Sequence, residues 1–225
     1  ITIGGAICGL MALLIGRYTM RLRGAYFGIA TLAFAEAVRQ IVLEFYATFK
    51  VSLFEGSHGI TLPIAHDLLF FYYTFLGAAA VIVGASWFIH RSKFGYALRA
   101  IRESEIAAEL SGVPTLRHKV SAYAVTGFFI GLLGGIHAYW LSYISPGDVF
   151  SISHTIYMII MALLGGMGTV FGPVLGAVLL SLANELLAAE FLYTYFLLLG
   201  VLLLAVIFFL PRGVGGLFSG KRMPG

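Results

Sequence analysis

Seven apolar segments, separated by short polar stretches, are the feature of this 225-residue chain that limits its possible folds most strongly. They run over 1–16, 25–47, 68–89, 119–142, 153–166, 172–189 and 194–210. About 20 apolar residues in a helix cross the roughly 30 Å hydrocarbon core of a bilayer, and these runs lack the alternation of barrel strands. We therefore predict an all-α fold, a polytopic transmembrane helix bundle of about seven apolar segments. Residues 153–189 would form either two thin spans or a re-entrant pair.

The composition agrees with a protein embedded in lipid. Hydrophobic residues make up 60% of the chain and charged residues 11%, whereas ordinary soluble domains carry roughly 25% charged residues. The net charge of +4 does not indicate a nucleic-acid partner, because membrane topology accounts for the distribution of the basic residues. The partner that composition indicates is the lipid bilayer.

The basic residues also predict the orientation of the chain. Twelve of the 14 lie in three clusters between the apolar segments. The clusters are Arg17, Arg21 and Arg23; Arg91, Lys93, Arg99, Arg102, Arg117 and Lys119; and Arg212, Lys221 and Arg222. Seven crossings place all three on one side, which the positive-inside rule makes cytoplasmic. We expect segment 91–118 and the C-terminus in the cytoplasm, and the loops 48–67 and 143–152 outside.

The longest polar interruption, 95–112, carries charges at helical spacing and has no Gly or Pro between Tyr96 and Ser111. We interpret it as one short amphipathic helix on the membrane surface. Its mostly small, apolar face would consist of Ala97, Ile101, Ser104 and Ala108.

Three polar residues stand out inside the second apolar segment: Glu36, Arg39 and Gln40. Glu36 and Arg39 are three residues apart and share one face of a helix. An unpaired charge at the centre of a membrane helix costs about 2.5–3.5 kcal/mol on insertion scales, a cost that pairing should reduce. The group therefore marks either a water-lined pathway or an interhelical clamp, and the sequence leaves both open.

Glycines recur every four residues in two places, at Gly127, Gly131 and Gly135 and at Gly168, Gly172 and Gly176. This spacing exposes the backbone on one helix face and favours close helix packing. Pro173 suits the first turn of a helix that begins near Gly172, because its missing N–H is not needed there.

Motifs for chemistry are absent from the sequence. It contains no phosphate-binding loop with a Gly-Lys-Ser/Thr ending and no His-Glu-x-x-His metal motif, and its six histidines show no ligand spacing. The single cysteine, Cys8, cannot form an intrachain disulfide. We expect no catalytic residue, no metal site and no cofactor.

Three stretches together, Arg21–Glu36, Ser92–Gly112 and Leu164–Ala177, resemble the LivM-type permeases of branched-chain amino acid ABC importers. The resemblance implies one permease domain over 1–225 whose N-terminal part is missing, in a bacterial inner membrane. It implies three kinds of partner: a homologous second permease, two cytoplasmic ATPases and an extracytoplasmic binding protein for amino acids.

The same resemblance makes 92–112 the coupling segment, which docks on the ATPase. Matched residue by residue, it assigns this contact to Gly95, Arg99, Arg102, Glu103, Glu105, Ala107, Ala108 and Gly112. The chain would import leucine, isoleucine and valine and leave ATP hydrolysis to its partners. Two alternatives stay open: a permease of the same superfamily for urea, short-chain amides or other amino acids, and an ion-driven secondary transporter.

Overall fold

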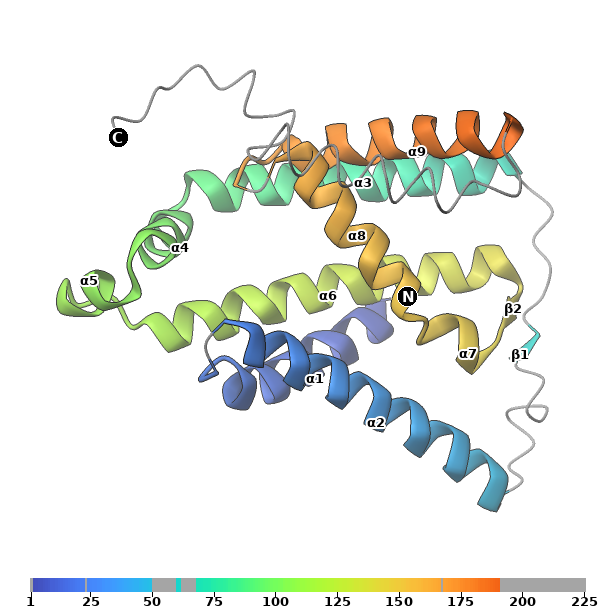
Figure 1. Ribbon diagram of the computed structural model, residues 1–225, viewed down its shortest axis with the longest axis horizontal. Coiled ribbons are helices and arrows are strands. Elements are labelled where there is room, and N and C mark those ends of the chain that lie inside the picture. Colours follow the sequence, from blue (N-terminus) through green and yellow to red (C-terminus); the bar gives the residue numbers. More distant parts are fainter. Residues whose placement is uncertain (1, 23, 50–59, 62–67, 167, 191–225) are drawn as a thin grey trace. The chain divides into compact units, whose positions relative to one another are not determined.

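The computed structural model describes the chain except for 1, 23, 50–59, 62–67, 167 and 191–225. It forms two compact units, Ile1–Phe150 and Ser151–Gly225, and each is considered by itself (Figure 1). The prediction of one permease domain over 1–225 stays a prediction. The all-α, multi-spanning fold is confirmed, because the described residues are mostly helical and include several helices long and apolar enough to cross a membrane.

The helices of the first unit follow the apolar segments closely. They are α1 (Thr2–Thr19), α2 (Ala25–Phe49), α3 (Leu68–Arg91), α4 (Lys93–Glu103), α5 (Glu105–Leu110), α6 (Thr115–Leu141) and α7 (Pro146–Val149). The long helices α1, α2, α3 and α6 correspond to the first four predicted segments, and α6 begins before the predicted 119. A fifth apolar stretch of spanning length runs over Gly147–Gly165. The predicted segment 194–210 lies outside the described residues.

The most extensive helix contact in the first unit is that of α1 with α6. A Cβ atom built on Gly131 would stand 2.6 Å from the Cβ of Cys8, and one on Gly127 would stand 2.6 Å from the Cβ of Ala12. Gly135, one turn further along α6, is half-buried. The facing glycines of α1 are Gly5, Gly9 and Gly16. Backbone therefore approaches backbone along this contact, and a side chain at either α6 position would separate the helices.

Two short strands join the loops that were predicted to lie outside. β1 (Ile60–Thr61) pairs antiparallel with β2 (Tyr143–Ile144), with Ile60 opposite Ile144. β2 directly follows α6, whereas α4 and α5 lie at the other end of that helix (Figure 1). The pairing brings the loop between α2 and α3 to the loop after α6.

The second unit is a hairpin of α8 (Ile152–Gly165) and α9 (Gly172–Glu190). Its contact is tight because a Cβ atom on Gly176 would collide with the carbonyl of Met161, and one on Gly165 with the carbonyl of Gly172. Gly168 is exposed in the connection between the helices, with φ at +103°. There it provides a backbone conformation that other residues rarely adopt.

The start of α9 confirms the predicted place of Pro173. The helix begins at Gly172, so the proline falls in the first turn. The N–H of Gly172 donates to the hydroxyl of Thr169 at 3.0 Å, which satisfies one of the free donors of a helix start.

Candidate functional site

The polar segment between α3 and α6 folds as two helices. Ser104 ends α4 with an extended backbone (φ −158°, ψ 114°), and its hydroxyl accepts the N–H of Ala107 at 3.3 Å to start α5. The expectation of one continuous amphipathic helix is therefore wrong. Its physical reason is that a serine side chain replaces the backbone acceptor at a helix start, so the chain can turn there without Gly or Pro.

Both ends of the segment are also fixed by local bonds. The hydroxyl of Ser92 caps α4 by accepting the N–H of Gly95 at 3.2 Å. Gly95 is buried against the carbonyl of Ile89, and a Cβ atom there would collide with it. After α5, Gly112 takes φ +82°, the left-handed conformation in which glycine commonly ends helices.

Side chains of α4 tie it to both neighbouring long helices. Arg99 donates to the carbonyl of His90 at 3.1 Å, and its guanidinium lies 4.3 Å from the ring centre of Tyr96. A cation near the last carbonyls of α3 is favourable there. Phe94 stacks on His118 of α6, with ring centres 5.5 Å apart. Arg99, predicted to contact an ATPase, thus holds α4 against the end of α3.

The acidic residues of α5 bind to α6. Glu105 forms an ion pair with Lys119 at 2.6 Å, and the buried hydroxyl of Thr115 donates to Glu109, also at 2.6 Å. These two links connect α5 to the first turns of the longest helix in the described chain. A force applied to α5 would therefore reach α6 through two charge-assisted contacts.

Two of the four residues of the expected apolar face of this segment are turned inward. Ile101 is 8% exposed and Ala108 is 3% exposed, because α4 and α5 pack on each other and on α6. The face that includes these two residues cannot receive a partner without unpacking the chain, which corrects that interpretation.

The exposed surface of α4 and α5, here called the polar-segment ridge, is apolar at its outermost points. Leu110 is 85% exposed, and Ile106 and Tyr96 are each 64% exposed. The residues predicted for coupling that share this exposure are Arg102, Glu103, Ala107 and Gly112. Of the eight predicted residues, the other four (Gly95, Arg99, Glu105 and Ala108) are buried or half-buried. Sequence reasoning missed Ile106 and Leu110, and the available signal was that they lie three residues after Glu103 and Ala107, respectively.

The second predicted site is the polar triad of α2, Glu36, Arg39 and Gln40, whose side chains contact one another as their spacing predicts. Glu36 accepts from Arg39 at 2.6 Å and from Gln40 at 3.0 Å, both through Oε1. None of the described side chains of α2 is buried. The hydrogen bonds of the triad are therefore formed within its own helix, and its outer side is exposed.

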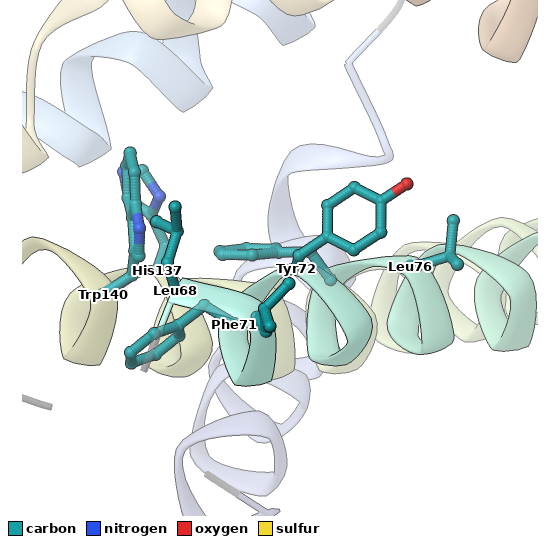
Figure 2. Close-up of a pocket in the computed structure, with 8 residues that line it drawn as sticks. Leu68, Phe71, Tyr72, Leu76, His137 and Trp140 are labelled. Atoms are coloured by element: carbon teal, nitrogen blue, oxygen red, sulfur yellow. The ribbon is translucent and has the colours of Figure 1, made fainter. Parts of the chain in front are cut away.

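A groove lies between α3 and α6 in the first unit. Its cavity of about 670 Å³ has an apolar wall of Leu68, Leu69, Phe71, Tyr72, Phe75, Leu76, His137 and Trp140. Figure 2 shows His137 and Trp140 side by side, with ring centres 5.7 Å apart. His137 thus packs among aromatic rings, and the described part of the chain holds no group of three residues suited to a metal ion.

Comparison with known proteins adds an independent finding. The sequence model of one family, described as "Branched-chain amino acid transport system / permease component", matches residues 1–207. No solved structure matches the chain.

Three relatives illustrate the range of the similarity. The chain is 28% identical to the high-affinity branched-chain amino acid transport system permease protein LivM of Salmonella typhimurium and 29% identical to that of Escherichia coli K12. These alignments cover 94% and 92% of the chain and 56% of each relative. It is also 27% identical to the xylose transport system permease protein XylH of Escherichia coli K12, over 88% of the chain and 50% of the relative. The chain therefore spans about half the length of the curated relatives it matches.

Proposed function

Because the chain belongs to the family of branched-chain amino acid transport system permease components, we propose that it is the translocation subunit of an ATP-driven importer for leucine, isoleucine and valine. It is a multi-pass membrane protein. It would act in a bacterial inner membrane with a second, homologous permease. Two cytoplasmic ATPases and an extracytoplasmic binding protein would complete the assembly.

The polar-segment ridge is the observation that supports ATP coupling. Leu110 and Ile106 expose large aliphatic side chains to solvent in a segment that is otherwise polar. Burial of an exposed Leu or Ile side chain is worth about 1.5–3 kcal/mol, while charges at the edge of a contact mainly set orientation and register. In the proposed complex these two residues enter an apolar groove of the ATPase, with Arg102 and Glu103 at its rim.

The internal bonds of α4 and α5 provide a route from this contact to the membrane. Arg99 links the segment to α3, and Glu105 and Glu109 link it to α6. Movement of the docked ATPases on ATP binding would therefore displace α3 and α6 together, which is what alternating access requires of a permease.

The orientation of the chain is part of the proposal. The basic clusters favour a cytoplasmic position for α4 and α5. The pairing of β1 with β2 supports a common side for the two loops assigned to the exterior. The cytoplasmic C-terminus rests on basic residues in 191–225, outside the described residues.

Substrate choice within the superfamily rests on the relatives named for branched-chain amino acids. Urea, short-chain amides and other amino acids are the alternatives from the same class. An ion-driven transporter, which would use Glu36 and Arg39 without any ATPase, is the alternative from another class.

The test is to purify the tagged full-length protein from its native membrane in mild detergent and to identify the proteins that accompany it. We expect an ATPase with a nucleotide-binding loop to co-purify. Leu110→Asp and Arg102→Glu should reduce its recovery by about tenfold or more, which corresponds to 1.4 kcal/mol or more of contact free energy.

Arg117→Glu is the matched control. Arg117 is an exposed basic residue of the same basic cluster as Arg102, but it lies on α6 rather than on the ridge. Its variant should retain the ATPase. Full ATPase recovery with both ridge variants would show that the ridge is not the coupling surface.

A further inference from the structure

Glu36 and Arg39 form an ion pair near the middle of an apolar helix. They are the twelfth and fifteenth residues of α2, which has 25 residues. At 1.5 Å per residue, they lie roughly 16–21 Å from the start of the helix, close to the centre of a hydrocarbon core about 30 Å thick. The pair is thus far from the headgroups on both sides.

The described chain leaves the outer side of this pair uncovered. The side chain of Glu36 is 48% exposed and that of Arg39 is 34% exposed, and the bonds described for Glu36 come from α2 itself. Lipid tails offer no hydrogen-bond partner, and a charge left unpaired at this depth costs about 2.5–3.5 kcal/mol. A polar occupant from outside the described chain is therefore favoured beside the pair.

We propose that this occupant is the transported amino acid, whose ammonium group binds Glu36 and whose carboxylate binds Arg39 at one stage of its passage. The inference rests on the proposed function and names the chemical class that this site accepts, an α-amino acid zwitterion.

The charges of the pair match those of a zwitterion. Before substrate enters, Glu36 and Arg39 neutralise each other at 2.6 Å. The ammonium group of the arriving amino acid can replace the Arg39 guanidinium as the partner of Glu36. The carboxylate of the amino acid then binds the Arg39 guanidinium, which has five N–H donors. Four charges then form two pairs, and the net charge within the membrane stays at zero throughout. No proton transfer is needed.

Apolar residues flank the pair on the same face of α2. Leu32 is four residues before Glu36, and Leu43 is four residues after Arg39, so all four lie on one helical stripe. Leu32 is 47% exposed and Leu43 is half-exposed. They offer an aliphatic surface on either side of the charged centre, which suits the branched side chain of leucine, isoleucine or valine.

This arrangement distinguishes amino acids from the neutral solutes of related permeases. A sugar or an amide carries no opposite full charges, so it could not replace the internal ion pair without leaving both charges unpaired. A charge left unpaired at the centre of a membrane helix costs about 2.5–3.5 kcal/mol on insertion scales. The site would therefore select against the class of substrate named for the xylose relative.

The experiment uses the complete transporter with its second permease, ATPases and binding protein in proteoliposomes. Two readouts are compared for each variant: uptake of radiolabelled leucine, and ATP hydrolysis stimulated by the leucine-loaded binding protein. The test variant is Glu36→Gln/Arg39→Gln, which removes both charges together and lowers the cost of insertion. The matched control is Glu44→Gln, two turns further along the same helix.

We expect the double variant to assemble and to keep stimulated ATP hydrolysis within about twofold, while leucine uptake falls by about tenfold or more. Arg39→Lys, which keeps the positive charge without the bidentate fork, should retain part of the uptake. Glu44→Gln should behave as the wild type.

Two results would overturn the inference. Unchanged leucine uptake by the double variant would show that substrate does not use the pair. Loss of the second permease from the purified double variant would assign the pair to an interhelical clamp. Absence of leucine uptake by the wild-type transporter is a different result, because it would remove the proposed function as well.

Discussion

Replacing Gly131 with alanine tests the packing of α1 against α6 most sharply. The new Cβ atom would stand 2.6 Å from the Cβ of Cys8, 2.9 Å from its Sγ and 3.0 Å from the carbonyl oxygen of Gly4. Such distances are far below van der Waals contact, so the helices must move apart. Overpacking of this kind costs about 1–3 kcal/mol.

Gly134 provides a matched control three residues along the same helix, because a Cβ atom there meets nothing within 4 Å. Alanine favours a helix over glycine by about 1 kcal/mol, and both variants receive this gain. The difference in stability between Gly131→Ala and Gly134→Ala therefore isolates the packing cost.

The assay is the apparent Tm of the detergent-solubilised protein, followed by fluorescence-detected size exclusion after heating. A cost of 1 kcal/mol lowers Tm by roughly 2–4 °C in a chain of this size. We expect Gly134→Ala to match or exceed the wild type and Gly131→Ala to fall below it. Adding Cys8→Gly to Gly131→Ala should restore part of the loss, since the side chain that it meets is removed. Equal Tm values for the two alanine variants would refute the close approach of α1 and α6.

Two further predictions concern the other tight contacts. Ser104→Ala removes the hydroxyl that caps α5 at the N–H of Ala107, and such caps contribute about 0.5–2 kcal/mol. We therefore expect the amide hydrogens of α5 to exchange faster in this variant than in the wild type. Unchanged exchange would mean that the cap does not stabilise the helix. Gly176→Ala places a Cβ atom on the carbonyl of Met161 and should lower Tm. Val178→Ala, at an exposed position of the same helix, should change Tm little. A larger loss of Tm in Val178→Ala than in Gly176→Ala would contradict the α8–α9 contact.

The membrane helices followed from the sequence because their cause is local. A run of apolar residues of sufficient length is itself the reason for a span, so α1, α2, α3 and α6 begin and end near the predicted residues. The start of α9 was predicted for the same kind of reason, since Pro173 fits only the first turn of a helix.

The polar segment was harder to predict because its shape depends on contacts between helices. Ser104 could cap a helix or continue one, and only the extended backbone at that residue decides between them. The inward direction of Arg99 and Ala108 depends on where α3 and α6 lie, which helical spacing within the segment does not give. A serine followed directly by a glutamate, as in Ser104–Glu105, is nevertheless a recognisable helix-start signal.

The contacts within the intramembrane triad, unlike the shape of the polar segment, could be predicted from the sequence. Glu36, Arg39 and Gln40 meet as their spacing predicts, because neighbours three and four residues apart on a helix lie together in any fold. Their exposure could not be predicted, since it depends on which other helices cover α2. Figure 1 shows α2 leading away from α1 and α6 along most of its length.

ATP dependence of leucine uptake tests the central claim most directly. The complete transporter is reconstituted in proteoliposomes with its ATPases accessible to added ATP, and radiolabelled leucine is supplied on the side of the binding protein. The proposed function predicts accumulation that requires ATP, continues after sodium and proton gradients are collapsed, and disappears with Leu110→Asp. Accumulation that follows an ion gradient in the absence of ATP would contradict it and would identify an ion-driven transporter instead.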